Sequence, residues 1–377
     1  MLDKVLLFPY YLTLKLRHGL YNCGLKKVHT CNVPTICVGN ITVGGTGKTP
    51  HTEMVLRTLL ASEEWGMKNI AVLSRGYKRR SKGFQQVTRD GSAKLFGDEP
   101  LQIKKKFPAV TVAVDRDRVE GCSFLTDPEK LKTSRKARKC IDKEVPQADV
   151  IVLDDAFQYR ALKAKYNIVL IDYNRPIYDD SLMPFGRLRD LPERIYEADM
   201  IIVTKCPAFM ENWERTEWLK PLGITNFNPD TCVGTDARGK QVTVVFTSIT
   251  YSQLEKIYDE GDPRYIYSKK AILFTGIAKD TPLRRFLSDS YKIVRHFRYG
   301  DHHKFSNSDI RSIRSAAEDC PTAVVITTEK DSQRVLDNKK VPGMLRERMF
   351  RIPIEVFFLS DNEKAVFETT LLNALKG

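Results

Sequence analysis

The stretch Thr35–Pro50, with the sequence TICVGNITVGGTGKTP, decides how this chain is expected to fold. It opens with the short apolar run Thr35–Val38, continues through the glycine-rich segment Gly39–Thr49, and leads into a helix-compatible run that starts near Pro50. A glycine-rich turn between a buried strand and a helix lets backbone N–H groups close around phosphate oxygens, and the helix dipole adds to that attraction. The order of these segments predicts a nucleotide-binding P-loop at Gly39–Thr49 rather than an ordinary glycine-rich turn.

Several positions of this P-loop have expected tasks. Lys48 would reach the β- and γ-phosphates of the nucleotide, and the hydroxyl of Thr49 would bind Mg²⁺. The strict motif has glycine where this chain has Thr42, but three later glycines still supply the tight backbone. The residues expected to bind the nucleotide are Thr42, Val43, Gly44, Gly45, Thr46, Gly47, Lys48 and Thr49.

Short apolar runs alternate with helical segments through the first two thirds of the chain. The runs are Thr35–Val38, Ile70–Leu73, Val110–Val114, Val150–Leu153, Ile168–Ile171 and Met200–Val203. Continuous runs of this kind are typical of strands that are buried on both faces, so the sheet should be parallel and covered by helices. The predicted fold class is α/β, with a P-loop NTPase-like, doubly wound parallel sheet in an α/β/α arrangement.

A stretch rich in Gly, Asp and Asn, Asn226–Lys240, interrupts this pattern, and a second series of apolar runs follows it. The second series consists of Val242–Phe246, Ile272–Phe274, Val324–Thr327 and Ile354–Phe358. It indicates a second, smaller α/β domain. The expected division is an amino-terminal helix at 1–23, a P-loop domain at 24–228, a linker at 229–250 and the smaller domain at 251–377.

Two acids stand at the end of a buried strand, where a P-loop enzyme needs an acid for its magnesium shell. Asp154 and Asp155 directly follow Val150–Leu153, and this placement makes them candidate metal ligands with Thr49. The alternative is that they cap the next helix, and the sequence leaves open which of the two faces the metal. The segment Thr204–Pro207 lacks the aspartate that guanine recognition would need, so a GTPase is disfavoured.

The composition limits the class of partner. Of 377 residues, 61 are Lys or Arg and 47 are Asp or Glu, which leaves a formal net charge of +14 and favours polyanionic partners such as phosphates, anionic lipids or nucleic acid. Hydrophobic residues make up 42% of the chain, which excludes disorder as the dominant state. The eight cysteines are scattered without a C-x-x-C pair and indicate reduced thiols in a cytosolic protein.

The first 21 residues are apolar and basic but contain no uninterrupted apolar stretch near the ~20 residues that a membrane span needs. On a helical projection, one face carries Val5, Phe8, Leu12, Leu16 and Leu20, and the other carries Lys4, Lys15 and His18. This pattern is typical of a helix that lies in a membrane interface. A helix that packs on its own domain is the alternative, and the sequence leaves both open.

Three further segments carry side chains that could take part in catalysis or ligand binding. Gly300–Ser306 contains adjacent histidines, which form a polar surface turn or help to position the base that a kinase needs. Phe96–Pro100 carries adjacent carboxylates beside Gly and Pro, which indicates a turn first and catalysis second. Arg75 follows the run Ile70–Leu73 and Ser74, at the strand end where α/β sheets bind ligands, although a loop ion pair would also explain it.

Taken together, these segments resemble the tetraacyldisaccharide 4′-kinases, the lipid A 4′-kinases of Gram-negative bacteria. The matching segments are Val38–Pro50, Leu73–Tyr77, Gly97–Pro100, Leu153–Arg160, Pro184–Arg189, Asp301–His303 and Thr327–Asp331. The resemblance implies transfer of the ATP γ-phosphate, with Mg²⁺, to the 4′-hydroxyl of an acylated glucosamine disaccharide 1-phosphate. It also implies two α/β/α domains joined by a short β linker. The expected location is the cytoplasmic face of the inner membrane, with a peripheral or monotopic helix on its anionic surface.

By the same resemblance, Asp98 is the candidate base and is oriented by His302. Lys48, Thr49, Asp154 and Asp155 belong to the phosphate and magnesium site, and Arg75, Arg118 and Arg189 are candidate contacts to anionic groups of the substrate. The chain departs from the family at Ala156 and Tyr159, so a role for a histidine at position 159 is not carried over.

Two other functions compete with this one. A P-loop ATPase or a kinase of a soluble small molecule would share the nucleotide site but would use its first helix only for packing. A nucleic-acid-binding protein would share the charge, but the sequence has no zinc-finger, RNP-like or bZIP pattern, so no nucleic-acid partner is expected. No obligate protein partner is expected either.

Overall fold

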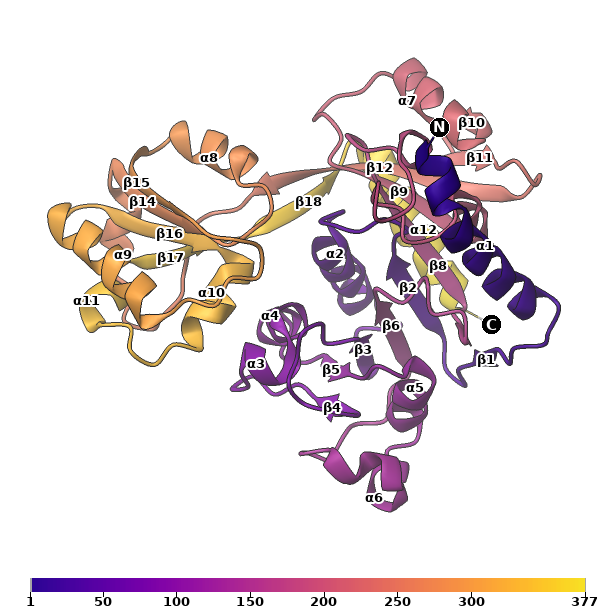
Figure 1. The fold of residues 1–377 in the computed structure, drawn as a ribbon, viewed down its shortest axis with the longest axis horizontal. Helices are drawn as coiled ribbons and strands as arrows, with labels where there is room; N and C mark the ends of the chain where they lie inside the picture. Colours follow the sequence, from indigo (N-terminus) through magenta and orange to yellow (C-terminus); the bar gives the residue numbers. More distant parts are fainter. Residues whose placement is uncertain (1, 377) are drawn as a thin grey trace.

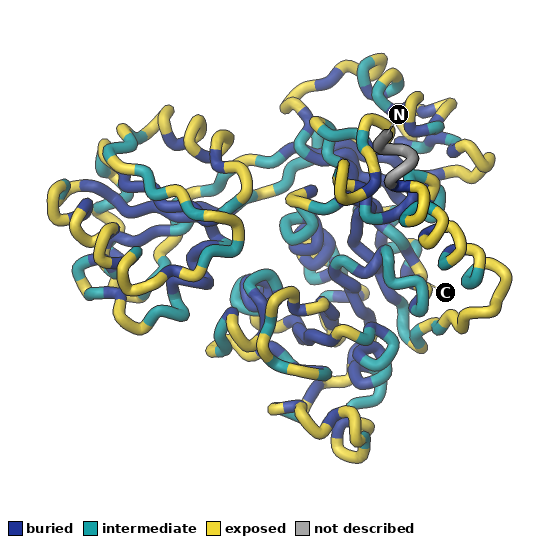
Figure 2. The backbone as a smooth tube through the Cα atoms, in the orientation of Figure 1, coloured by how far each residue is buried: buried dark blue, intermediate teal, exposed yellow. Residues whose placement is uncertain are grey.

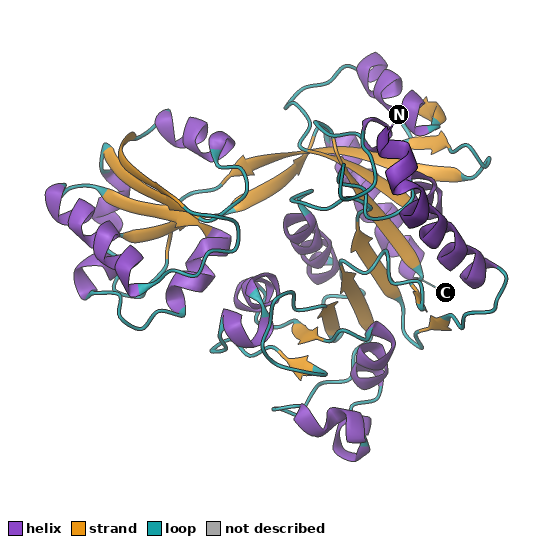
Figure 3. Ribbon diagram, in the orientation of Figure 1, coloured by secondary structure: helices purple, strands orange, loops and turns teal. Residues whose placement is uncertain are grey.

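The computed structural model describes the backbone of residues 2–376 and the side chains of residues 7–376. Two bodies, each built on its own sheet, lie side by side in Figure 1, with the smaller body at the left. Figure 3 shows helices flanking both sheets. Lys4 and Val5, which the helical projection included, lie outside the described side chains.

The large sheet has a parallel centre, as predicted. Its order is β10-β11-β12-β9-β8-β2-β6-β3-β5-β4. The parallel strands are β12 (Gln241–Tyr251), β9 (Met200–Thr204), β8 (Tyr166–Asp172), β2 (Thr35–Gly39), β6 (Val150–Asp154), β3 (Ile70–Ser74) and β5 (Thr111–Val114). Antiparallel strands extend both edges: β10 (Thr225–Asn228), β11 (Val233–Thr235) and β4 (Gln85–Gln86). The doubly wound α/β fold is therefore confirmed.

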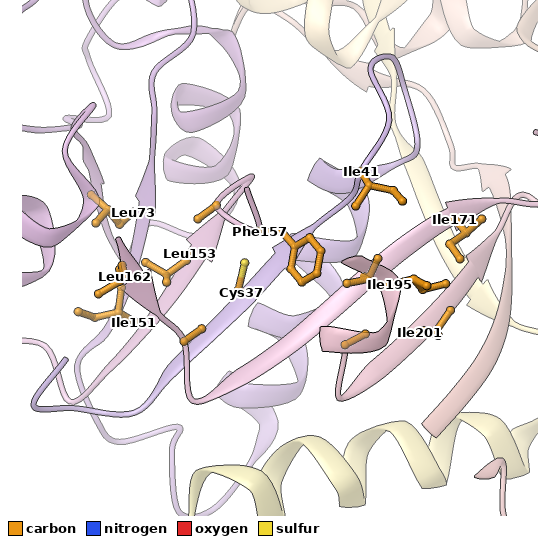
Figure 4. Close-up of a cluster of buried hydrophobic side chains, with 14 of the residues drawn as sticks. Cys37, Ile41, Leu73, Ile151, Leu153, Phe157, Leu162, Ile171, Ile195 and Ile201 are labelled. Atoms are coloured by element: carbon orange, nitrogen blue, oxygen red, sulfur yellow. The ribbon is translucent and has the colours of Figure 1, made fainter. Parts of the chain in front are cut away.

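Alternate residues of each central strand enter different cores, because successive side chains point to opposite faces of a sheet. In β6, Val150 and Val152 face the core under helices α2 (Lys48–Ala61), α4 (Asp98–Lys106) and α12 (Asp361–Leu375). Ile151 and Leu153 face the other core, together with Cys37 and Phe157, as Figure 4 shows. Helices α1 (Leu2–Asn22), α5 (Arg118–Thr126) and α7 (Asn212–Leu219) cover that second face. Figure 2 shows the resulting buried centre of the large body.

The small sheet has the order β13-β17-β16-β14-β15. Its strands are β13 (Glu255–Lys256), β14 (Lys270–Thr275), β15 (Lys292–Arg298), β16 (Val324–Thr328) and β17 (Met349–Ile352), and β13 alone among these five is antiparallel. Helices α8 (Thr281–Ser288), α9 (Asn307–Asp319), α10 (Glu329–Leu336) and α11 (Gly343–Arg346) surround it. We refer to residues 252–353 as the small unit and to the rest as the large unit.

Two antiparallel strands, β12 and β18 (Ile354–Phe358), connect the units. The residues Thr243–Phe246 of β12 pair in parallel with β9 in the large sheet, and Thr247–Tyr251 then pair antiparallel with β18. The runs Val242–Phe246 and Ile354–Phe358, which the sequence suggested as parts of a new series, therefore lie in the large sheet and in the connection. Helix α12, inside the expected 251–377 domain, returns to the core of the large sheet.

Helix α1 presents apolar side chains in two directions. Leu7 and Leu14 are buried in the large unit, whereas Phe8, Leu12 and Leu16 are 54–63% exposed. The helical projection placed His18 on the polar face with Lys15, but the structure exposes Lys15 and buries His18 against Asp190 at 2.6 Å. Within residues 2–376, no helix is long and apolar enough to cross a bilayer.

Candidate active site

The P-loop joins β2 to α2 at the carboxyl edge of the large sheet. Gly44 and Gly47 have φ values of 107° and 86°, a left-handed conformation that glycine adopts without strain. Gly47 is the N-cap of α2, and among the described residues no side chain caps the first N–H groups of this helix. Those N–H groups and the positive end of the helix dipole form a site for a phosphate.

A network of polar contacts holds the P-loop in shape. The amide of Asn40 donates to the hydroxyls of Thr42 at 3.1 Å and Thr46 at 2.8 Å. The hydroxyl of Thr204, at the end of β9, donates to the carbonyl of Thr46 at 3.0 Å. Asn40 and Thr204 were not among the predicted site residues. Because the loop backbone is fixed by neighbouring strands, its N–H groups are positioned before a nucleotide binds.

Lys48 lies beside Asp155, at the end of β6. The ammonium donates to Asn40 Oδ1 at 3.2 Å and lies 3.8 Å from Asp155 Oδ1. Arg189 donates to both oxygens of Asp155 and to Asn40 Oδ1. Burial raises the pKa of Asp155, but the charges of Lys48 and Arg189 outweigh it and leave the pKa below its ordinary value. Arg189, expected as a substrate contact, is thus already paired with an acid of the site.

Asp154 lies deeper in the site than Asp155. Its oxygens accept from the hydroxyls of Ser74 at 3.0 Å and Thr52 at 3.3 Å. Burial raises the pKa of Asp154 to about 6, and the charges of Glu99 and Asp155 add to that effect. Burial disfavours the charged form of Asp154, and a cation bound beside it would stabilise that form, so the residue suits a cation site.

The residues present fit Mg²⁺, which prefers oxygen ligands and keeps several from water or phosphate. Within the described residues, no cluster of three or more His, Cys, Asp and Glu side chains could hold a metal ion. Asp154 and Asp155 would therefore act with the Thr49 hydroxyl and the nucleotide phosphates. Thr52, which was missed by the sequence analysis, keeps Asp154 oriented.

The structure brings Asp98 and His302 together from the two units. Asp98 is the first residue of α4, and His302 lies between β15 and α9, with Nδ1 at 3.3 Å from Asp98 Oδ2. Arg334 of α10, another residue that the sequence analysis missed, donates to the same oxygen through Nε at 2.8 Å and NH2 at 2.6 Å. The Thr327–Asp331 motif covers the start of this helix and ends before Arg334.

The other predicted arginines differ in accessibility. Arg75 is exposed at the carboxyl end of β3. Arg118 is buried, and its guanidinium donates to the carbonyls of Asp115 and Asp155 at 3.2 and 3.4 Å. Tyr159, to which no role was carried over from the family resemblance, donates to Asp117 at 2.9 Å. Of the three predicted arginines, Arg75 is therefore the one with a free approach to a ligand from solvent.

Comparisons with known proteins show the family to which the chain belongs. A family profile described as tetraacyldisaccharide-1-P 4′-kinase matches residues 4–376. The tetraacyldisaccharide 4′-kinase of Phocaeicola vulgatus is 36% identical over 355 residues, which cover 93% of this chain and 88% of that protein. That of Porphyromonas gingivalis is 34% identical over 373 residues, which cover 97% and 95%.

A solved structure has the same fold. The crystal structure of LpxK from Aquifex aeolicus in complex with ATP superimposes with a TM-score of 0.68 at 24% identity, covering 100% of this chain and 99% of that one. The similarity extends over both units and the connection between them.

Proposed function

Since the chain belongs to the tetraacyldisaccharide 4′-kinase family, we propose that the site at the carboxyl edge of the large sheet transfers the γ-phosphate of ATP to the 4′-hydroxyl of tetraacyldisaccharide 1-phosphate. The chain is thus an ATP-dependent kinase of lipid A biosynthesis, and an ATPase or kinase of a soluble small molecule is not favoured. The observation that carries the residue assignment is the contact of Asp98 with His302 across the two units.

We propose that Thr42–Thr49 enclose the triphosphate of ATP. The uncapped N–H groups at the start of α2 would bind its oxygens, and Lys48 would move from Asn40 and Asp155 to the β- and γ-phosphates. A lysine placed there stabilises the charge that accumulates as the terminal phosphoryl group is transferred. Mg²⁺, held by Thr49, Asp154 and Asp155, would neutralise charge on the same phosphates.

Asp98 is the proposed base. As the 4′-oxygen attacks the γ-phosphorus, its proton passes to the Asp98 carboxylate, the bond from the γ-phosphorus to the bridging oxygen breaks, and ADP leaves with that oxygen. His302 would orient Asp98 from the small unit. Because the two residues come from different units, His302 orients the base only when the units are in contact. The same contact excludes water from the site.

Arg75 is the proposed contact to an anionic group of the sugar substrate, since it is exposed at the same edge of the sheet. For Arg118 and Arg189 we propose a supporting role instead. Each donates to Asp155, through the backbone carbonyl or the carboxylate, and keeps that acid in place. We further propose that the P-loop body and the smaller body are separate folding domains.

We propose that the protein works at the cytoplasmic face of the inner membrane. A tetraacylated substrate stays in a bilayer, and Phe8, Leu12 and Leu16 form an exposed apolar stripe on α1. Lys15 is exposed on the same helix and would interact with anionic head groups, to which each Lys or Arg contributes about 1 kcal/mol. The net charge of +14 acts in the same direction.

The test is incubation with labelled ATP, Mg²⁺ and tetraacyldisaccharide 1-phosphate, followed by location of the label on the sugar. We expect label at the 4′-oxygen, and Asp98→Asn and His302→Ala should each reduce turnover with little change in ATP affinity. Residues that act as a unit are non-additive. If the barrier increase of the double variant equals the sum of the two single increases, the proposed pairing is wrong.

A further inference from the structure

We propose that Arg334 is a positioning residue of the kinase reaction: its guanidinium holds the Asp98 carboxylate across the contact between the two units, so that one carboxylate oxygen faces the sugar hydroxyl. This inference rests on the proposed role of Asp98 as the base. It adds a third residue to the expected pair and gives that residue a task that neither Asp98 nor His302 performs.

The guanidinium is fixed on its own unit before it reaches Asp98. NH1 of Arg334 donates to Asp331 Oδ1 at 2.8 Å and to the carbonyl of Gly276 at 3.2 Å, and the Arg334 side chain is only 5% exposed. The Asp331 carboxylate is itself held by the hydroxyl of Thr328 at 2.8 Å and the N–H of Gly276 at 2.8 Å. A planar guanidinium with this many fixed partners presents Nε and NH2 in one direction, and that direction is towards Asp98.

Both donors bind the same oxygen of Asp98. Nε and NH2 of Arg334 lie 2.8 and 2.6 Å from Oδ2, and Nδ1 of His302 lies 3.3 Å from it. Within the part of the chain that the structure describes, every hydrogen bond to the Asp98 side chain ends on Oδ2. Oδ1 is therefore the oxygen that can accept the proton of a substrate hydroxyl.

Arg334 also contacts His302. NH2 of Arg334 lies 3.1 Å from Nδ1 of His302. A guanidinium can donate but not accept, so Nδ1 of His302 accepts from Arg334 whenever it is not donating to Asp98. The arginine thus lies in contact with both members of the pair.

The charged groups around Asp98 change its pKa, and this change can be measured. Burial raises the pKa of Asp98, but hydrogen bonds from His302 and Arg334 outweigh it, and the pKa lies below its ordinary value. The titratable and charged groups that face Asp98 are His302, between β15 and α9, and Lys330, Arg334 and Asp337, on α10 and at its end. Without the guanidinium, burial would dominate and the carboxylate would lose its proton only at higher pH.

Other ion pairs besides that of Arg334 join the two units, and one of them supplies a matched control. Lys330, one turn earlier on α10, pairs with Glu99 at 2.9 Å, and Lys106 of α4 lies 3.5 Å from Glu329 of α10. Lys330→Met removes an ion pair between the same two helices but no hydrogen bond to Asp98. A role of Arg334 limited to holding the units together would make the two variants behave alike.

The experiment compares kcat/KM for the acylated disaccharide, at saturating ATP, as a function of pH. We expect Arg334→Met to lower kcat/KM at least tenfold and to move its acid limb to higher pH by on the order of one unit. A separate titration with ATP at neutral pH should show little change in KM for ATP. Arg334→Lys should recover part of the rate and part of the shift, and Lys330→Met should shift the limb much less. Thermal unfolding checks that each variant folds. If Arg334→Met does not fold, the comparison is made with Arg334→Lys.

Asp98→Asn in the same assay separates the proposal that Asp98 is the base from the proposal that Arg334 positions it. If Asp98→Asn retains near wild-type turnover, Asp98 is not the base, and the inference about Arg334 fails with it. If Asp98→Asn is inactive but both Arg334 variants keep the wild-type acid limb, the base assignment stands and Arg334 is not its positioning residue. Ionisation of the substrate phosphate is common to all variants and does not affect the comparison.

Discussion

His51 of helix α2 joins the P-loop to Thr247, the residue at which β12 leaves the large sheet. Nδ1 lies 2.7 Å from the carbonyl of Gly47, and Nε2 lies 3.0 Å from the hydroxyl of Thr247. Since a carbonyl can only accept, Nδ1 carries the proton, and a neutral ring then accepts from Thr247 through Nε2. One buried imidazole thus connects the nucleotide loop with the strand that leads to the small unit.

The first prediction concerns the pH dependence of stability through His51. Burial lowers the pKa of His51 to about 4, below the ~6.5 of an unfolded histidine. As the pH falls, the unfolded chain takes up this proton first, so the stability present above pH ~6.5 declines towards pH 4. At pH 5 the loss should be on the order of 2 kcal/mol relative to neutral pH.

Urea unfolding at pH 7 and pH 5 measures this loss, and His51→Asn provides the comparison. The variant should be less stable at pH 7, because buried partners lose hydrogen bonds at about 1–3 kcal/mol each. It should also lack the part of the pH dependence that His51 causes. An identical decline in both proteins would show that other groups are responsible.

The second prediction concerns Lys48. Lys48→Ala should lower phosphoryl transfer by about 10²–10³-fold or more, because it removes a positive charge aimed at the transferred group. Turnover measured with labelled ATP tests this expectation. The matched control is Lys68→Ala, an exposed lysine that contacts Trp65, which should keep wild-type turnover. Wild-type activity in Lys48→Ala would contradict the P-loop assignment.

The third prediction concerns the attachment of α1 to the site. His18 bonds to Asp190, the residue after Arg189, at 2.6 Å, and the pair is buried. His18→Ala should lower the free energy of unfolding by about 1–3 kcal/mol and reduce turnover through Arg189. Chemical denaturation and the kinase assay provide the measurements, with Lys15→Ala, exposed on the same helix, as the control. Unchanged stability would mean that the bond from His18 to Asp190 does not help to hold α1 on the large unit.

The fourth prediction concerns the exposed stripe of α1. Replacing Phe8, Leu12 and Leu16 by Ser should reduce partition onto anionic vesicles at least tenfold, because burial of each apolar side chain contributes roughly 1.5–3 kcal/mol. Turnover of detergent-dispersed substrate should remain within about twofold, since these side chains point away from the core. Vesicle sedimentation measures the partition.

The control for the stripe is Met67→Ser with Tyr267→Ser, two strongly exposed residues outside α1. This double variant should sediment with vesicles as the wild type does. If the triple variant also sediments normally, the membrane contact lies elsewhere on the protein.

Local patterns in the sequence were enough to predict the strands and the P-loop. Alternation and continuity of apolar residues depend on neighbours a few positions apart, so Val150–Leu153 and Ile70–Leu73 could be recognised as buried strands before any contact was known. The same holds for Gly44 and Gly47, whose φ values only glycine adopts freely. The contact of Asp98 with His302 was expected through the family resemblance, not from spacing.

Contacts between distant residues were decided by the tertiary structure. The return of α12 to the large core, the reach of Arg334 to Asp98 and the bond from His51 to Thr247 join residues that lie far apart in the chain. Such pairs depend on strand order and on how helices pack, which no local period encodes. The direction of His18 is a case in point: the helical projection grouped it with Lys15, but Lys15 is exposed, and the position of Asp190 places His18 on the inner side of α1.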